Sequence, residues 1–413
     1  MLRPASSRAP ASPLGALAFA AALPLLLAAC HGRSGPPAAV VDTVGGVPVV
    51  RNDTVDRPLG WTLRKTWEVG AVEGPDALAR VTPAWLAVGG GDVFIMDRPN
   101  HRILSVDLAS GHVVARFGHE GQGPFEFRTP VAIWARGDTV DVFAGRRQAV
   151  ESFTAAGKPV SERPLDGLLQ AGYTGEAIRA GPNGIVFPSE PHVRAMYGKA
   201  ADGKGALSFP RRLIGVSASD TIRYAEMRIG GGHTIEIDRC GMRTRWDVRP
   251  VGAPDLAWSG APWGVSVNAG PAYAVDVFGA RRMRVTRRFG ARPLTRSAAL
   301  GILRHRFRIL LKARCALDLD KFLDGAGKAD HLTFISAVAL SPDGRLWVRR
   351  SPEVGSEIDV FGRDGGYLGT LPSTSPYPEL FAPDGSFIAI RTDSLGVQYV
   401  DRYVVEETGG TGG

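Results

Sequence analysis

The strongest constraint in this sequence is an internal repeat of about 46 residues. A unit of two short apolar segments begins at a glycine turn, and a matching unit begins 46 residues later. Each apolar segment alternates with polar residues and is bounded by Gly, Asp, Asn or Pro, which is typical of short β-strands. The turn glycines of the repeat units are Gly91, Gly137, Gly184, Gly264, Gly344 and Gly385.

A period in the forties, with about four strands in each unit, is the sequence form of a β-propeller blade. One blade cannot bury both faces of its sheet, so blades pack face to face around an axis. The 52 glycines and 30 prolines of the chain supply the many turns that this fold needs. The sequence therefore predicts an all-β, six-bladed β-propeller over residues 60–406. The repeat is weak between residues 190 and 256, where we expect either a long insertion or a seventh blade.

Two motifs link the chain to a known family. Residues 97–103 read D-x-x-N-x-R-I, and residues 118–127 read G-x-x-G-x-G-P-x-E-F. These motifs resemble NHL-type repeats, and the chain as a whole resembles bacterial six-bladed β-propeller lipoproteins. We expect a structural role for them, with Asn100 in a strand-to-strand turn and Arg102 lying over neighbouring strands. A ligand site in the glycine-rich loop is the alternative.

The first 29 residues are predicted to be a signal peptide. Arg3 and Arg8 precede an uncharged stretch over residues 14–29, which is short for a membrane span but suits a secretory signal. The stretch ends Leu-Ala-Ala-Cys and resembles the lipobox of bacterial lipoproteins, which implies a lipid on Cys30. Because His31 rather than aspartate follows Cys30, we expect anchoring in the outer membrane, facing the periplasm. Ordinary signal cleavage beside a chance cysteine is the alternative.

The ends of the mature chain are predicted to lie outside the repeats. Residues 31–39 are small and rich in turn formers, so they read as a tether within the segment 30–59. Residues 40–50 are a candidate strand that closes the ring by pairing with the last strands, around residues 397–405. Residues 407–413 are predicted to form a disordered tail.

Two cysteines remain after signal cleavage, Cys240 and Cys315. In an oxidising compartment they could form one disulfide bond, with buried free thiols as the alternative.

One segment is strongly basic. Residues 281–314 contain twelve Arg or Lys residues and no Asp or Glu. Thr295 or Ser297 can cap a helix, which predicts an inserted basic helix near residues 296–314. A docked helix with a solvated basic face is one interpretation. The other is contact with an anionic surface through Arg304, Arg306 and Arg308. Nucleic acid is not an expected partner of an exported, lipid-anchored domain.

The sequence carries no local motif for catalysis. It lacks G-x-S-x-G, a P-loop, H-E-x-x-H and C-x-x-C, so no catalytic residue and no metal ligand is assigned. The preferred interpretation is a monomeric, non-catalytic binding or scaffold module without a cofactor, recognising a protein, peptide or glycan. The alternative is a calcium-dependent or other metal-dependent hydrolase or lyase whose ligands converge on the propeller channel. That alternative rests on analogy between folds.

Overall fold

A computed structural model describes most of the chain after residue 38. The described residues are 39–127, 130–145, 147, 149–164, 177–182, 184–190, 209–217, 220–229, 233–239, 242–307 and 317–407. The predicted signal peptide with Cys30, both remaining cysteines, Arg308 and residues 408–413 lie outside this set. No helix among the described residues is long and apolar enough to cross a membrane.

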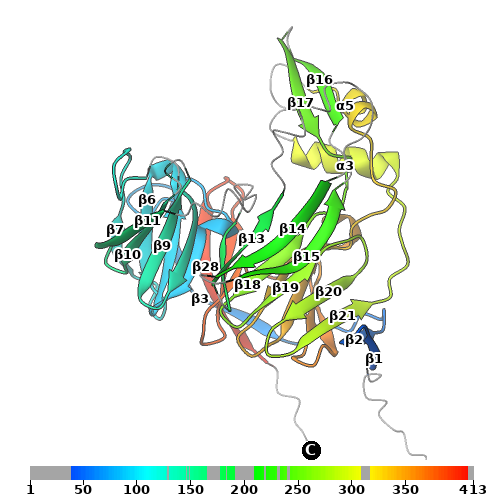
Figure 1. Ribbon diagram of the computed structural model, residues 1–413, viewed down its shortest axis with the longest axis horizontal. Helices are drawn as coiled ribbons and strands as arrows, with labels where there is room; N and C mark the ends of the chain where they lie inside the picture. Colours follow the sequence, from blue (N-terminus) through cyan, green and yellow to red (C-terminus); the bar gives the residue numbers. More distant parts are fainter. Residues whose placement is uncertain are drawn as a thin grey trace, which may run out of the picture. The chain divides into compact units, whose positions relative to one another are not determined.

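Six four-stranded antiparallel blades form the protein, so it is a six-bladed β-propeller as predicted (Figure 1). Blade 1 contains β4 (Leu86–Gly89), β5 (Asp92–Asp97), β6 (Arg102–Asp107) and β7 (Val113–Phe117). Blade 2 contains β8 (Pro130–Arg136), β9 (Thr139–Ala144), β10 (Ala149–Thr154) and β11 (Pro159–Pro164). Blade 3 contains β12 (Arg179–Gly181), β13 (Gly184–Ser189), β14 (Phe209–Val216) and β15 (Thr221–Ile229).

The other three blades follow the same order from the axis outwards, except at the closing strand. Blade 4 contains β18 (Ala257–Ala261), β19 (Gly264–Asn268), β20 (Ala274–Phe278) and β21 (Arg282–Arg287). Blade 5 contains β22 (Ile335–Leu340), β23 (Leu346–Arg350), β24 (Ile358–Phe361) and β25 (Tyr367–Leu371). Blade 6 contains β26 (Leu380–Phe381), β27 (Phe387–Thr392), β28 (Gln398–Glu406) and, at its outer edge, β3 (Thr62–Val69). Among the described residues, three short 3-10 helices lie in connections: η1 (Pro83–Trp85), η2 (Arg98–Asn100) and η3 (Pro352–Val354).

Six apolar clusters hold the ring together, one between each pair of neighbouring blades. Strand β5 shows how the sequence produces them. Val93 and Ile95 point into the cluster shared with blade 6, whereas Phe94 and Met96 point into the cluster shared with blade 2. Because side chains alternate along a strand, one apolar strand supplies both interfaces of its blade.

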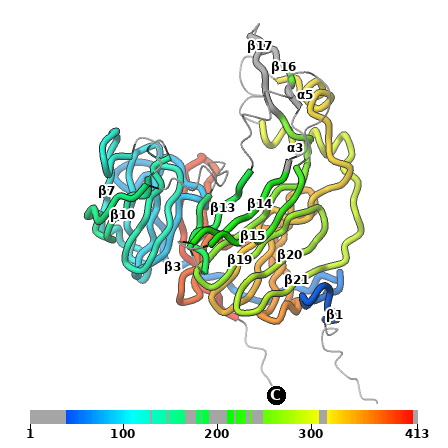
Figure 2. Tube along the Cα trace, in the orientation of Figure 1, coloured from blue at the N-terminus to red at the C-terminus, as the bar shows by residue number. Residues whose placement is uncertain are grey.

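The strand that closes the ring differs from the prediction. Residues 40–50 were expected to pair with the C-terminal strands, but β3 occupies that position and pairs antiparallel with β28. The predicted segment instead forms β1 (Val40–Val44) and β2 (Val47–Asn52), and β2 runs parallel to β21 at the edge of blade 4 (Figure 2). An outer strand has one solvated face, so the charges in β3 are compatible with that position while Trp67 and Val69 are buried.

An accessory module lies outside the ring. It contains the hairpin of β16 (His233–Arg239) and β17 (Met242–Val248) and two helices, α3 (Arg296–Arg306) and α5 (Leu319–Ala326) (Figure 1). Leu303, Phe322 and Leu323 are buried in one apolar cluster that joins these elements. The predicted basic helix near residues 296–314 begins as α3, which Thr295 caps by accepting a hydrogen bond from Ala298 N and which ends at Arg306. Residues 308–314 of that prediction lie outside the described residues. The hairpin lies in the region where the repeat was weak, so the described residues there show an insertion after blade 3.

The family-like motif in blade 1 has the expected structural role. Asn100 donates a hydrogen bond to the Asp97 carboxylate over 2.7 Å in the turn between β5 and β6. Arg102 donates to the same carboxylate and to the carbonyl oxygens of Pro75 and Ala77. The motif therefore fixes the chain segment that leads into blade 1.

A buried ionic network joins blades 4 and 5 to the N-terminal segment. The Asp359 carboxylate is fully buried and accepts hydrogen bonds from Arg287 and Arg350, with nitrogen-to-oxygen distances of 2.7–3.0 Å. Arg350 also donates to both carboxylate oxygens of Asp56. The Arg287 guanidinium lies 4.1 Å from the centre of the Tyr367 ring. Arg287 also pairs with Asp56 over 2.9 Å, so the buried Asp359 and the more exposed Asp56 together balance two arginines that come from different blades.

We expect the Asp359→Ala substitution to lower the free energy of unfolding by about 3–5 kcal/mol, because it removes the fully buried carboxylate that two buried guanidinium groups share and leaves them only the more exposed Asp56. Urea unfolding followed by tryptophan fluorescence measures the change. The exposed Asp330→Ala variant is the control, with an expected change within about 0.5 kcal/mol. An Asp359→Ala protein as stable as the wild type would contradict this role.

Candidate functional site

The central channel contains a cavity of about 260 Å³. All six innermost strands, β4, β8, β12, β18, β22 and β26, contribute to its wall. The wall residues are Leu86, Ala87, Val88, Gly89, Gly90, Ile133, Trp134, Ala135, Gly137, Arg179, Ala180, Ser259, Gly260, Ala261, Pro262, Trp263, Ala339, Leu340, Glu379, Leu380, Phe381 and Pro383.

Close approach of neighbouring inner strands shapes this cavity. A Cβ atom on Gly89 would lie 2.6 Å from the Ala135 Cβ, and one on Gly260 would lie 2.9 Å from the Ala180 carbonyl oxygen. Glycine is therefore required where these blades meet at the axis. Trp263 is fixed in the wall, because its indole nitrogen donates to the Leu340 carbonyl oxygen in the next blade over 2.9 Å. The channel is thus rigid and mostly apolar.

Two charged residues, Arg179 and Glu379, interrupt this apolar wall. Arg179 is the first residue of β12, and its guanidinium donates to the Leu86 carbonyl oxygen of blade 1 over 3.1 Å. Burial lowers the pKa of Arg179 to about 10, although the negative charge of Glu379 opposes this shift. The guanidinium remains charged at neutral pH. Its other N–H groups lie in one plane and can donate further hydrogen bonds.

Glu379 directly precedes β26, and its backbone N–H donates to the Ile388 carbonyl oxygen over 3.0 Å. Its carboxylate accepts no hydrogen bond from the part of the chain that the structure describes. Burial raises the pKa of Glu379, and the positive charges of Arg349 and Arg179 act against that rise. Arg349 is itself held 4.5 Å from the centre of the Tyr377 ring. Glu379 therefore presents hydrogen-bond acceptors to the cavity that no described residue occupies.

Arg179 and Glu379 come from blades on opposite sides of the ring, blade 3 and blade 6. Their charges influence each other, but no hydrogen bond joins them. Each lies at the start of its inner strand, and inner strands of a propeller run in the same direction along the axis. The two charges therefore lie at the same end of the channel. The arrangement is chemically suited to bind a polar group placed between them.

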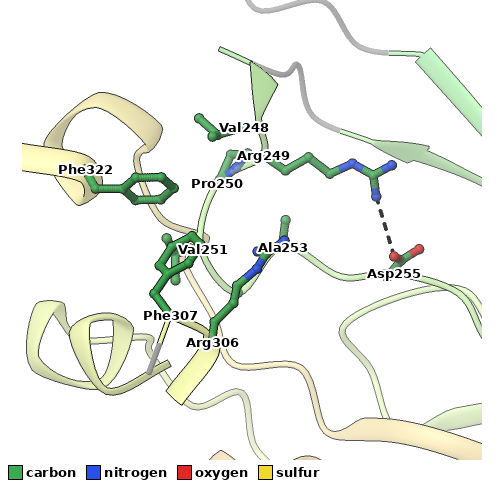
Figure 3. Close-up of a pocket in the computed structure, with 10 residues that line it drawn as sticks. Val248, Arg249, Pro250, Val251, Ala253, Asp255, Arg306, Phe307 and Phe322 are labelled. Atoms are coloured by element: carbon green, nitrogen blue, oxygen red, sulfur yellow. Dashed lines mark ion pairs between the residues drawn. The ribbon is translucent and has the colours of Figure 1, made fainter. Parts of the chain in front are cut away.

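A second cavity, of about 660 Å³, lies where the accessory module meets the segment that leads into blade 4. Phe307 and Phe322 line one side with Val251, and Arg249 and Asp255 form an ion pair of 3.5 Å on the other side (Figure 3). The charges around this cavity largely balance one another. Arg249 also pairs with Glu190, and Asp255 also pairs with Arg211.

Two of the predicted surface contacts, Arg304 and Arg306, are exposed in the last turn of α3, and Arg306 also lines the second cavity. Other basic residues of the segment have acidic partners that the local sequence did not reveal. Arg284 pairs with Asp276, and Arg296 pairs with Asp320 and Asp324 of α5. Arg308, Cys30, Cys240 and Cys315 are outside the described residues. Among the described residues, no group of three or more His, Cys, Asp or Glu side chains could hold a metal ion.

The sequence analysis missed Arg179 and Glu379, although a signal for both was present. When the six repeat units are aligned on their turn glycines, the residues five positions earlier are Leu86, Ala132, Arg179, Ser259, Ala339 and Leu380. The residues six positions earlier are Trp85, Val131, Ile178, Trp258, Val338 and Glu379. Each column contains one charged residue, at a position where the inner strand faces the axis or the next blade. A charge in such a column is the feature that would have identified the site.

Comparisons with known proteins leave the chain without a family. No family model and no curated protein matches it. Among solved structures it resembles a protein of Bacteroides fragilis described as exported, with TM-score 0.48, 10% identity, and coverage of 87% of this chain and 99% of that chain. It also resembles a DUF4221 family member from Bacteroides vulgatus, with TM-score 0.41, 6% identity, and coverage of 85% and 100%. These similarities are too low to transfer an activity or a ligand.

We expect Glu379→Gln to change how stability depends on pH. Because burial raises the pKa of Glu379 in the folded protein, the native state keeps a proton that the unfolded chain releases above its ordinary value of 4.5. The wild type therefore loses stability as pH rises above 4.5, and the variant lacks this loss. The free energy of unfolding of Glu379→Gln should exceed that of the wild type at neutral pH, and the difference should shrink towards pH 4.5.

Urea unfolding between pH 4.5 and pH 8 measures this difference. The exposed Glu120→Gln variant is the matched control and should follow the wild type. If the free energy of unfolding of Glu379→Gln equals that of the wild type at every pH, the Glu379 carboxylate does not cause a loss of stability as pH rises.

Proposed function

We propose that this protein is a non-catalytic binding protein of the bacterial cell envelope whose propeller channel receives a small ligand or the end of a peptide or glycan. The observation that carries the proposal is the channel cavity, in which Arg179 and an unpartnered Glu379 carboxylate interrupt an apolar wall. Glu379 is half-buried and receives no hydrogen bond from the described residues, so its carboxylate is open to a donor that a ligand brings into the cavity.

The rigidity of the channel supports recognition. The six inner strands are held by the apolar clusters between blades, so the cavity is formed before a ligand arrives. Preformed sites avoid the cost of ordering the protein on binding. A volume of about 260 Å³ lies just below the usual range for drug-sized ligands, which is about 300–1,000 Å³. The channel therefore suits a ligand smaller than that class.

The membrane attachment in this proposal rests on the sequence. The Leu-Ala-Ala-Cys ending of the signal segment supports lipidation of Cys30 and anchoring in the outer membrane, with the propeller in the periplasm. The exposed cations Arg304 and Arg306 at the end of α3, with Arg308 after them, would add contact with anionic headgroups. We propose that the protein works as a monomer in this position.

We expect native mass spectrometry of the protein purified from its membrane to detect one small ligand per chain. The Ser259→Phe variant should lose this ligand, because Ser259 lines the cavity and a phenyl ring would fill it. Ser161→Phe places the same ring on the exposed outer strand β11 and should keep the ligand. The spectra also report the number of chains in the particle.

Two results would contradict this proposal. One is the absence of any ligand whose binding depends on Ser259. The other is a stoichiometric calcium ion together with hydrolysis of an added lactone or ester, which would favour the metal-dependent enzyme.

We expect the Cys30→Ser protein, once its signal segment has been cleaved, to move from the membrane fraction into the soluble periplasmic fraction, because the substitution removes the site of lipid attachment. Fractionation followed by immunoblotting measures the change. Continued membrane association after a high-salt wash would exclude the lipid anchor.

The released Cys30→Ser protein also allows the basic helix to be tested separately. Glutamate at positions 304, 306 and 308 should weaken its co-sedimentation with vesicles that contain anionic phospholipid. Glutamate at the exposed positions 281, 282 and 288 reverses the same number of charges elsewhere and is the control. If the two triple variants lose the same amount of vesicle binding, the loss reflects net charge and not a contact made by residues 304, 306 and 308.

A further inference from the structure

The channel presents two opposite charges that face one cavity without bonding to each other. We propose that it binds a zwitterion, a small molecule that carries a carboxylate and an ammonium group on a short apolar body, such as an apolar α-amino acid. This inference rests on the proposed function and specifies the ligand class of the same site.

Arg179 supplies the carboxylate-binding half. A guanidinium has five N–H donors in a planar fork that matches a carboxylate. One terminal nitrogen of Arg179 donates to the Leu86 carbonyl oxygen, which fixes the direction of the side chain across the ring. In the described structure no carboxylate forms an ion pair with Arg179, so the remaining donors are available to a ligand.

Glu379 supplies the ammonium-binding half. Its carboxylate has acceptor sites for several hydrogen bonds and receives none from the described residues. The nearby Arg349, which interacts electrostatically with Glu379, is stacked against Tyr377 and does not line the cavity. A ligand ammonium group would provide the donors that the protein lacks, in a site where charge-assisted hydrogen bonds are strong.

The rest of the cavity wall favours a ligand whose uncharged part is apolar. Beyond the charged end the wall contains the apolar residues Val88, Trp263 and Phe381. It has no further acidic or basic side chain. Since both charges lie at the start of the inner strands, the charged groups of the ligand would bind at that end. Its apolar body would extend along the axis towards Pro383.

The volume excludes long chains. The cavity volume is about 260 Å³. An amino acid with a side chain of up to about the size of leucine or phenylalanine fits this space, and a polymer could place only its end there.

Isothermal titration calorimetry with defined probes tests the inference. The probes are L-alanine, L-valine, L-leucine and L-phenylalanine, together with two analogues of leucine. The first analogue, 4-methylpentanoate, lacks the amino group, and the second, 3-methylbutylamine, lacks the carboxylate. We expect at least one of the four amino acids to bind the full mature chain. We expect each leucine analogue to bind at least tenfold more weakly than leucine.

Variants assign the two halves of the site. Glu379→Gln should weaken amino-acid binding at least tenfold while leaving any residual binding of 4-methylpentanoate unchanged. Arg179→Gln should weaken amino-acid binding by a similar factor while leaving any residual binding of 3-methylbutylamine unchanged. Glu120→Gln is the matched control and should bind like the wild type. If Arg179→Gln does not fold, as judged by circular dichroism, Arg179→Lys keeps the charge but loses the planar fork and should still weaken binding.

The outcomes separate this inference from the proposed function. If 4-methylpentanoate binds as tightly as leucine, the site recognises an acid and the zwitterion is wrong. If none of the four amino acids binds while native mass spectrometry finds a ligand that Ser259→Phe removes, the channel is a binding site for another class of molecule. If neither method finds a ligand in the channel, both the inference and the proposed function fail.

Discussion

The closed contact among six inner strands is the constraint on which the rest of the structure depends. Each inner strand contacts the inner strands of the two neighbouring blades, and at Gly89 and Gly260 the approach leaves no room for a Cβ atom. This closure fixes the size of the channel and aligns the six blades so that both faces of each can be buried. Arg179 and Glu379 can face one cavity from opposite sides of the ring only because the ring is complete.

Much of the fold could be predicted from the sequence because the repeat is local. The turn glycines mark each blade, and alternation within a strand such as β5 identifies the residues that supply both interfaces. The closing strand could not be identified in this way. Strand β3 pairs with β28 across more than 300 residues, and its charged residues make it look like any other solvent-exposed segment. Long-range pairing leaves no periodic signal at either partner.

The candidate site, unlike the fold, could not be predicted from local sequence patterns. Neither Arg179 nor Glu379 belongs to a motif, and each lies next to ordinary apolar residues. Their unusual character shows only when the six repeat units are aligned on their turn glycines. At each of these two aligned positions, one unit has a charged residue and the other five have uncharged residues. The acidic partners of the basic segment were also invisible locally, because Asp320 and Asp324 belong to a second helix that the sequence analysis did not predict. Local patterns therefore identified the scaffold, whereas function and charge balance depended on residues brought together by folding.

The composite sixth blade has a consequence for biogenesis. Its outer strand, β3, comes before blade 1 in the chain, and its other three strands come after blade 5. Blade 6 therefore cannot form until all five other blades have been synthesised. Until then, the apolar faces that blades 1 and 5 present to blade 6 have no partner, and such surfaces promote aggregation. During that interval a chaperone that shields exposed apolar sheets would protect these two faces.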